Sequence, residues 1–510
     1  MEQKKLDINS IVGFVLIFGI LIWIMYQNQP DPKVIAAEKA KKELVAKAAK
    51  AKELAQKSIE KAAVAVATTG DSTQLAQLQN TLGNFAYSAT LPSAKADFTT
   101  IENEVVQLKI ANKGGFIVEA VLKQHEKFKK GSGKLVDLIK DNNTNLNITL
   151  QTADNRSLNT KDLYFEPSLS KVGEDQILSM KLKAGADEFL EYKYILKPND
   201  YMIGFDVHSQ GLNKVLNTAK PLDLHWTMKT FRNEKSISYE NRYTEVYFEH
   251  KEGKIDYVGQ GENKEENAEN ATFVAFKQHF FSTILLTDKP FATSKLVSNN
   301  LVNDEAIDTV YTKQFTADLP LAFTNGELDY KMNWYLGPTD YKTLHKYDKN
   351  LEKIISLGWG IFGWINKFIF IPLFGFLSSY IAYGIAIIVF TILIKIAMSP
   401  ITFKSFLSQA KMKVLRPEIA ELGEKFKKDP MKKQQETMKL YNKAGVNPMA
   451  GCIPALIQLP FMYASFQFFP SAFELRQKSF LWADDLSSFD EVVKLPFHIP
   501  LYGDHISLFP

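Results

Sequence analysis

The segment IAIIVFTILIKIAMSP (residues 385–400) is an apolar run that contains a single charged residue, Lys395, and ends at Pro400. Apolar runs of about 20 residues are typical of helices that cross the hydrocarbon core of a bilayer. We therefore predict a transmembrane helix over residues 376–400. A charge inside such a helix costs roughly 3 kcal/mol, so Lys395 is a candidate functional residue.

Two further apolar runs are present. Residues 8–28 are predicted to form an N-terminal transmembrane signal anchor, and residues 447–472 another transmembrane helix. A cleaved signal peptide is the alternative for the first run, but a small-residue cleavage site does not follow it closely. The only cysteine, Cys452, lies in the later run, so no intramolecular disulfide is possible, and we interpret it as a small buried residue.

Residues 29–88 are rich in Ala, Lys and Glu, with pairs such as Glu38 and Lys42 spaced four apart. They are predicted to be a solvated spacer. Residues 89–345 change to short alternating runs with turn signals, including VVQLKIANKGGFIVEAVLK (105–123), LNITLQT (146–152) and TFVAFKQHFFSTILLTD (272–288). This pattern predicts one large antiparallel β domain, a sandwich or related sheet.

Residues 346–371 combine helical apolar spacing with Trp359 and Trp364 close to the start of the next apolar run. Aromatic anchors of this kind are typical of the membrane interface, so we predict an amphipathic interfacial helix that ends or bends near Pro372.

Residues 401–445 form a basic segment between two predicted spans, with eleven Lys or Arg and five acidic residues over 401–443. A short basic loop is expected on the cytoplasmic side, which places the N-terminus inside and the β domain outside. Leu415, Ile419, Leu422 and Phe426 mark a helical face, and Asp429 with Pro430 breaks it, so a helical hairpin is predicted. Its candidate contacts for anionic lipid are Lys411, Lys413, Arg416, Lys425, Lys427, Lys428, Lys432 and Lys433.

Several polar residues accompany Lys395. Thr391 precedes it by four residues and shares its helix face, and Gln458 lies mid-span between two prolines. Together with Tyr463, Ser465 and Gln467 they are predicted to wet a shared intramembrane cavity. The alternative is that the long stem of Lys395 carries its ammonium group to the interface.

Five motifs resemble the YidC-type membrane protein insertases in their Gram-negative form, which has a large periplasmic domain. They are KMKVLRPEIAEL (411–422), LYNKAGVNPMAGCIPALIQLPF (440–461), VAFKQHFF (274–281), NWYLGP (333–338) and FELRQKSFLWADDLS (473–487). The resemblance implies a multi-span α-helical membrane protein with a large all-β periplasmic domain (a β-supersandwich) and a cytoplasmic helical hairpin. Residues 473–510 would be a periplasmic loop that leads to the next span, so the chain is expected to lack the family's last two spans.

The resemblance also implies a function. Such proteins insert nascent inner-membrane proteins and help them fold, alone or with the Sec translocon and its accessory subunits, through a hydrophilic groove. Ribosome and targeting-factor contacts of the hairpin are implied as well, but no nucleic-acid sequence specificity, cofactor or metal. Thr391, Lys395 and Gln458 lie in or beside that groove, where the family's charge is characteristically an arginine; Lys395 departs from this pattern.

The sequence gives less support to three other classes of function. An enzyme is disfavoured because the eight histidines are scattered without a catalytic or metal-ligand motif, and His498, Asp504 and His505 lack further ligands. A transporter is disfavoured because no inverted repeat is visible. A membrane-tethered periplasmic chaperone or glycan-binding protein remains the alternative, and it predicts activity in the β domain alone.

Overall fold

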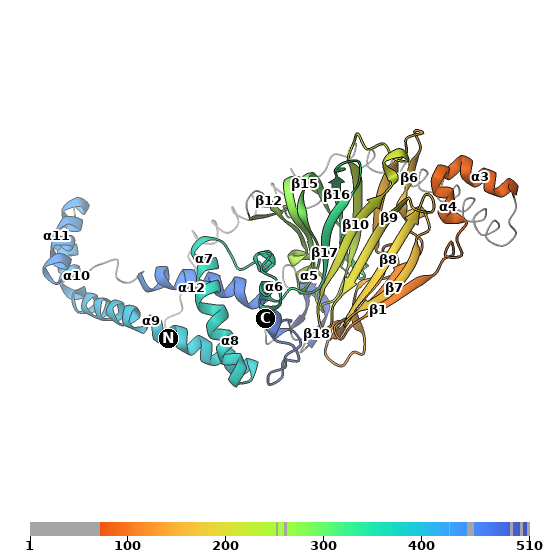
Figure 1. Ribbon diagram of the computed structural model, residues 1–510. Helices are drawn as coiled ribbons and strands as arrows, with labels where there is room; N and C mark the ends of the chain where they lie inside the picture. The colour runs from red at the N-terminus through yellow and green to blue at the C-terminus, as the bar shows by residue number, and fades with distance from the viewer. Residues whose placement is uncertain are drawn as a thin grey trace. The chain divides into compact units, whose positions relative to one another are not determined.

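The alternating segments form antiparallel strands, as the sequence predicts (Figure 1). The computed structural model describes residues 72–250, 253–259, 263–305, 307–427, 429–445, 453–489, 493–499 and 503–506. The predicted anchor over residues 8–28, most of the spacer, and Cys452 lie outside these residues.

Two sheets make up the β domain, and every described pairing between their named strands is antiparallel. The first sheet has four strands in chain order: β1 (Phe98–Glu102), β2 (Val106–Ala111), β3 (Ile117–Glu126) and β4 (Leu135–Ile139). Gly114 and Gly115, with φ of 86° and 68°, make the turn between β2 and β3, a conformation that favours glycine.

The second sheet has 13 strands, ten of them in the order β6-β5-β11-β16-β15-β17-β10-β9-β8-β7. Three more branch from it: β12 pairs with β13 and β14, and β14 pairs with β15. The strands are β5 (Thr144–Gln151), β6 (Ser157–Asn159), β7 (Glu166–Val172), β8 (Asp175–Lys183), β9 (Phe189–Leu196), β10 (Met202–Gln210), β11 (Leu222–Phe231), β12 (Glu245–His250), β13 (Lys254–Tyr257), β14 (Lys264–Lys277), β15 (Phe281–Asn300), β16 (Tyr311–Leu321) and β17 (Asp329–Pro338).

Large aromatic side chains fill the core of the β domain. The ring of Trp226 on β11 stacks on Phe276 of β14 with 3.7 Å between centroids, and Trp334 of β17 meets Trp226 edge-on at 4.8 Å. Each aromatic side chain buries roughly 150–250 Å² of surface. These contacts join β11, β14 and β17 through buried aromatic rings.

The end of the predicted spacer is structured. Helix α3 (Ser72–Leu82) is followed by η1 (Gly83–Phe85) and α4 (Ala86–Ala89). The side chains of Phe85, Ala86 and Ala89 are buried at 0%, 2% and 2% exposure. The boundary of a solvated spacer at residue 88 is therefore wrong, because this short apolar cluster has a core to pack into.

The predicted interfacial helix over residues 346–371 is wrong in its first half. After α6 (Tyr341–His345), Asp348, Asn350 and Gly358 have φ of 51°, 59° and 87°, and such left-handed values interrupt a right-handed helix. Only the short helix η4 (Leu351–Ile354) lies between them. A continuous helix begins at Gly360 and runs through α7 (Gly360–Ile365), the π-helical turn η5 (Asn366–Phe370) and α8 (Ile371–Tyr380).

Pro372 does not end this helix. The N–H of Ile371 donates to the carbonyl of Asn366, five residues back, and this wider turn accommodates the proline ring. The helix ends instead at Tyr380, where the hydroxyls of Ser378 and Ser379 both donate to the carbonyl of Gly375 and compete with the helical ladder.

The predicted helix over residues 376–400 is therefore divided. Its first residues belong to α8, Ile381 is extended, and α9 (Tyr383–Val414) starts afterwards. Helix α9 also continues past Pro400, which removes one backbone hydrogen bond without ending the helix.

Two helical stretches in the described part of the chain are long and apolar enough to cross a membrane, judged by length and composition: Gly360–Tyr380 and Tyr383–Val414. Helix α12 (Ile453–Ser471), inside the predicted span 447–472, is not one of them. Gln458, Gln467 and its prolines lower its mean hydropathy.

Two helices follow α9 where the hairpin is predicted: α10 (Arg416–Lys425) and α11 (Pro430–Lys443). Asp429 caps α11, its carboxylate accepting from the backbone N–H of Lys432 at 3.0 Å. Gly445, with φ of 61°, follows the second helix. Beyond α12 lie η7 (Phe473–Leu475) and the paired strands β18 (Val493–Ile499) and β19 (Gly503–Ile506).

Candidate functional site

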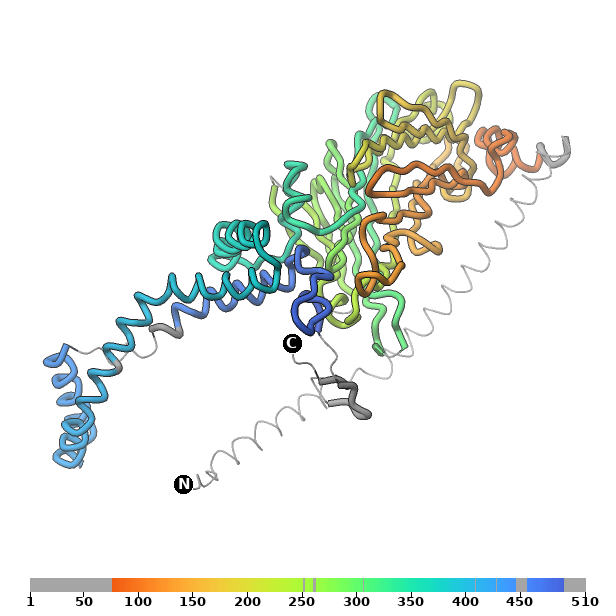
Figure 2. Tube along the Cα trace, turned by 90° about the horizontal axis from the view of Figure 1, so that it is seen from below, coloured from red at the N-terminus to blue at the C-terminus, as the bar shows by residue number. Residues whose placement is uncertain are grey.

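Helices α8, α9 and α12 pack through a cluster of phenylalanines. The ring centroid of Phe390 on α9 lies 6.3 Å from that of Phe468 on α12 and 4.9 Å from that of Phe370. Phe374 contacts Phe468 at 5.6 Å, and all four side chains are almost fully buried. Figure 2 shows α9 and α12 side by side over this contact. The polar residues predicted to line a cavity are thus carried by two helices that touch.

Lys395 lies one and a half turns beyond Phe390 on α9, and it is exposed. Its ammonium group makes no hydrogen bond or ion pair with the described residues. The hydroxyl of Thr391 donates to the carbonyl of Ile387 at 2.8 Å within the same helix. Gln458 is half-buried on α12. No side-chain hydrogen bond between described residues joins Lys395 to Thr391 or Gln458.

Two of the other predicted cavity residues, Tyr463 and Gln467, lie toward α7. The amide of Gln467 donates to the hydroxyl of Tyr463 at 3.4 Å, and the Tyr463 ring packs on Phe362 with 4.4 Å between centroids. Ser465 donates to the carbonyl of Phe461 at 2.9 Å. The structure therefore brings Tyr463 and Gln467 together, on the side of α12 that faces α7.

Trp359 and Trp364 flank the start of the helix at Gly360, with 74% and 55% of their surface exposed. Each ring packs against a phenylalanine of the same segment: Trp359 meets Phe362 edge-on at 5.3 Å, and Trp364 lies 5.7 Å from Phe368. Large exposed aromatic side chains at the end of an apolar helix are typical of the bilayer interface.

The predicted basic side chains are exposed on α9, α10, α11 and the turn after α10: Lys411, Lys413, Arg416, Lys425, Lys427, Lys432 and Lys433. Lys428 lies outside the described residues. Lys425 and Lys432 place their ammonium groups 5.8 and 5.7 Å from the ring centroid of Phe426, which brings the two helices' charges together at the turn.

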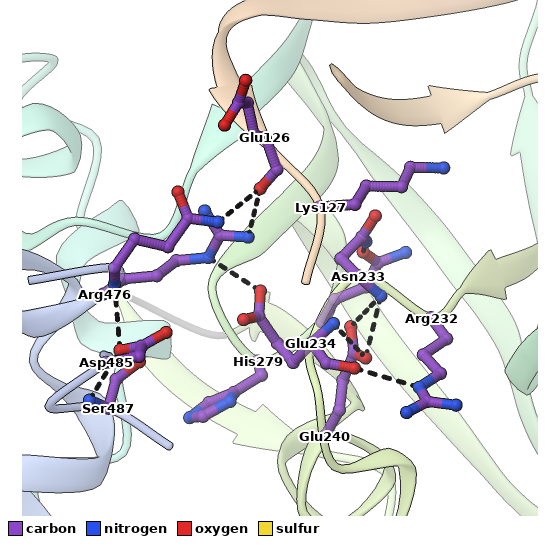
Figure 3. A network of polar contacts seen from close by, with 12 residues as sticks. Glu126, Lys127, Arg232, Asn233, Glu234, Glu240, His279, Arg476, Asp485 and Ser487 are labelled. Carbon is purple, nitrogen blue, oxygen red and sulfur yellow. Dashed lines mark hydrogen bonds and ion pairs between the residues drawn. The ribbon is translucent and has the colours of Figure 1, made fainter. Parts of the chain in front are cut away.

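Sequence analysis missed a buried polar network at the junction between the β domain and the segment that follows α12 (Figure 3). The guanidinium of Arg476 donates to Glu234 at 2.8 Å, and their side chains are only 3% and 9% exposed. Arg476 also donates to the carbonyl of Glu126 at 2.7 Å and lies over the ring of Phe281 at 4.9 Å. Gln477 donates to the same carbonyl at 2.8 Å.

His279 extends the junction to α12 itself. Its Nε2 lies 2.8 Å from the carbonyl of Pro470, so Nε2 carries the proton and donates it. Burial lowers the pKa of His279 to about 3, which leaves the ring neutral at physiological pH. The ammonium of Lys235 donates to the carbonyl of Phe489 at 3.2 Å. The end of α12 and the following loop are thus attached to the β domain at several points.

A second carboxylate lies beside the ion pair. Glu240 accepts from the backbone N–H of Asn233 at 2.9 Å and of Glu234 at 3.0 Å. Burial, and then the negative charge of Glu234, raise the pKa of Glu240 to about 8. One guanidinium thus faces two buried carboxyl groups.

Raising the pH from 5 to 9 is expected to destabilise the folded chain. The pKa of Glu240 is raised from 4.5 to about 8 on folding, so in this window the folded state binds more protons than the unfolded state, and its stability falls as pH rises. Glu240→Gln, which stays uncharged, should show a smaller fall. Unfolding midpoints of both proteins between pH 5 and 9 test this; parallel curves would contradict it.

No group of three His, Cys, Asp or Glu side chains that could hold a metal ion occurs among the residues described. The side chains of His498, Asp504 and His505 are outside that description.

The family models and the curated relatives that match this chain name the same kind of protein. The family models described as "YidC periplasmic domain" and "60Kd inner membrane protein" match residues 99–372 and 374–507. A "Membrane protein insertase YidC" of Parabacteroides distasonis is 36% identical over 99% of this chain and 81% of its own. The protein of the same name from Porphyromonas gingivalis is 34% identical with the same coverage. A solved structure titled "Active YidC insertase crystal structure with the first transmembrane domain resolved" has 18% identity and a TM-score of 0.29, and covers 78% of this chain and 77% of its own.

Proposed function

Because this chain belongs to the YidC family of membrane protein insertases, we propose that it inserts client proteins into the bacterial inner membrane through a polar, positively charged recess beside α9 and α12. The family's members are insertases, so the prediction that the chain is not an enzyme is confirmed. The observation that carries the proposal is Lys395, an exposed ammonium group inside an apolar helix that packs against α12.

The recess works by electrostatics and burial. A wet cavity that reaches partway into the bilayer shortens the apolar barrier that a client's polar segment must cross. The ammonium of Lys395 attracts acidic residues of that segment, and the attraction is stronger at low dielectric than in water. The client's own apolar segment then moves along α9 and α12 into lipid, where burial drives the insertion. Thr391, Gln458, Tyr463, Ser465 and Gln467 supply the polar surface.

The orientation of the chain in the membrane follows from the distribution of its basic residues. The basic helices α10 and α11 lie in the cytoplasm and the β domain lies in the periplasm, in keeping with the positive-inside rule. The basic side chains of the hairpin contact anionic lipid and approach the ribosome and targeting factors, and Trp359 and Trp364 anchor the helix at the interface. Cooperation with the Sec translocon belongs to the same proposal.

The test is insertion by the full-length protein in liposomes. A small two-span client is synthesised in their presence, and the protease-protected fraction is scored. Protein-containing liposomes are expected to protect the client well above protein-free liposomes. A stably folded protein that gives no protection would contradict the proposal, and it would favour a tethered periplasmic chaperone or glycan binder.

A further inference from the structure

A large polar cavity lies between the β3–β4 hairpin, the start of α9 and the segment after α12. Its volume is about 930 Å³. Ligand pockets typically measure about 300–1,000 Å³, so the cavity is large enough for a substantial polar group. The cavity is not part of the recess proposed for client insertion.

The walls of the cavity are held together by the junction network. The carbonyl of Glu126, at the end of β3, accepts from Arg476 at 2.7 Å and Gln477 at 2.8 Å. The carboxylate of Glu126 accepts from the backbone N–H groups of Gly131 and Gly133, which closes the hairpin loop on itself. The loop that carries Lys130 and the segment that carries Lys478 therefore face each other in a fixed arrangement.

The carboxylates that line the cavity are already engaged. Glu126 closes its own loop, Asp340 accepts from the backbone N–H of Thr343 at 2.9 Å, and Glu474 pairs with Lys342 at 2.7 Å. Lys130 and Lys478, which also line the cavity, pair with no carboxylate among the described residues. The lining has five Lys or Arg residues and three carboxylates, and two of its ammonium groups, those of Lys130 and Lys478, are available to a ligand.

The other three cationic residues of the lining already have carboxylate partners, and Arg476 is paired with the buried Glu234. Lys123 pairs with Glu102 at 3.3 Å and Lys346 lies 4.0 Å from Asp200, both on the exposed surface, where such pairs are weak. The floor is polar and neutral: Nε2 of His125 lies 3.2 Å from the hydroxyl of Tyr201. A phosphate group with an attached polyol matches this combination of free ammonium groups and hydrogen-bonding floor.

The place of the cavity in the fold favours a lipid as the source of that phosphate. Tyr383, the first residue of α9, and Phe473, close behind the end of α12, both line it. The ammonium of Lys478 lies 5.1 Å from the centroid of the Tyr383 ring. If α9 spans the membrane, as the proposed function requires, the cavity opens at the level of the periplasmic headgroups.

We propose that this cavity binds the phosphate-bearing headgroup of an anionic membrane lipid, with Lys130 and Lys478 as its principal ligands. The site is separate from the basic hairpin, which lies beyond the other end of α9. The inference rests on the proposed function only for the position of α9 in the membrane.

The test uses the full-length protein in detergent, titrated with dioctanoyl phosphatidylglycerol. Hydrogen exchange is followed in residues 123–135 and 473–480. The lipid is expected to slow exchange in both segments, and Lys130→Gln with Lys478→Gln is expected to weaken this protection about tenfold, as loss of about 1.4 kcal/mol predicts. If the double variant does not fold, Lys130→Gln and Lys478→Gln are tested separately, and each is expected to weaken the protection.

Two matched lysine pairs serve as controls. Lys171→Gln with Lys254→Gln changes exposed lysines of the β domain, and Lys411→Gln with Lys413→Gln changes the start of the basic region. Both should leave the protection of residues 123–135 and 473–480 unchanged. Equal weakening by either control pair would overturn the assignment to Lys130 and Lys478.

Three further titrations identify the ligand. Dioctanoyl phosphatidylcholine is expected to protect much less than phosphatidylglycerol, and equal protection would overturn the preference for an anionic lipid. Glycerol phosphate and inorganic phosphate are expected to protect weakly; if either matches the lipid, the site takes a soluble phosphate and the lipid assignment fails. Client insertion by the same preparation is scored separately, so a failure of the proposed function is not mistaken for a failure of this one.

Discussion

Replacing Arg476 with alanine is expected to destabilise the folded chain by about 3–5 kcal/mol, the usual cost of breaking a buried ion pair by removing one partner. The carboxylate of Glu234 would be left buried without its cation, beside the second buried carboxyl group of Glu240. The carbonyl of Glu126 would also lose one of its two donors. Urea unfolding of the purified protein, followed by tryptophan fluorescence, measures the difference in the free energy of unfolding.

A second ion pair in the same region provides the control. Lys342 and Glu474 are 2.7 Å apart, but the lysine side chain is 61% exposed, so Lys342→Ala should cost only about 0–1 kcal/mol. Arg476→Met combined with Glu234→Gln should cost less than Arg476→Ala, because it removes both charges. If Arg476→Ala is no more harmful than Lys342→Ala, the buried network does not hold the segment after α12 to the β domain.

The β domain is the part of the fold that sequence predicts best, and the reason is physical. Strands buried on one face require alternation, as in β2, and tight turns require glycine, as at Gly114 and Gly115. Both requirements concern neighbouring residues, so strands and tight turns can be predicted from short stretches of sequence. The order of strands in the 13-stranded sheet depends instead on pairings between distant segments, and the sequence carries no local sign of them.

Helix boundaries near the apolar runs were predicted less well, because the deciding contacts are not periodic. The predicted interfacial helix ends or bends near Pro372 and the predicted span ends at Pro400, yet the helix continues past each proline. In the first case a π-helical turn absorbs the proline, and in the second only one hydrogen bond is lost. The actual break, between Tyr380 and Tyr383, coincides with two serine hydroxyls that bond the carbonyl of Gly375.

The junction network shows a different limit of sequence analysis. Arg476 and Glu234 are 242 residues apart in the chain, and each has charged neighbours in the sequence that are at least partly exposed, such as Lys235 and Lys478. Nothing in the spacing of either residue indicates that it is buried. In the sequence, the stretch FELRQKSFLWADDLS (473–487) is recognisable only as a motif that resembles a family. In the structure, its Arg476 attaches the segment after α12 to the β domain.

The structure brings together only some of the residues that are predicted to line the recess. Tyr463 and Gln467 contact each other, but on the side of α12 that faces α7, and Thr391 bonds within its own helix. Lys395 and Gln458 are therefore the residues on which a test of the recess should concentrate.

Lys395→Leu is expected to slow client insertion about tenfold, which corresponds to the loss of about 1.4 kcal/mol of attraction in the rate-limiting step. Lys395→Arg keeps the charge and should insert nearly as fast as the wild type. Because leucine suits an apolar helix better than lysine, the variant should fold at least as stably, so slow insertion would not reflect unfolding. Protease protection of the two-span client in liposomes gives the rates.

Lys404→Leu is the matched control, because residue 404 lies nine residues further along α9 and so about half a turn round the helix, where it is also exposed. It should insert at the wild-type rate. A client whose translocated segment has no acidic residues supplies the second control, since Lys395 has nothing to attract in it, and wild type and Lys395→Leu should then be equal. If Lys395→Leu inserts the acidic client as fast as the wild type, the ammonium group reaches the interface through its long stem and takes no part in insertion.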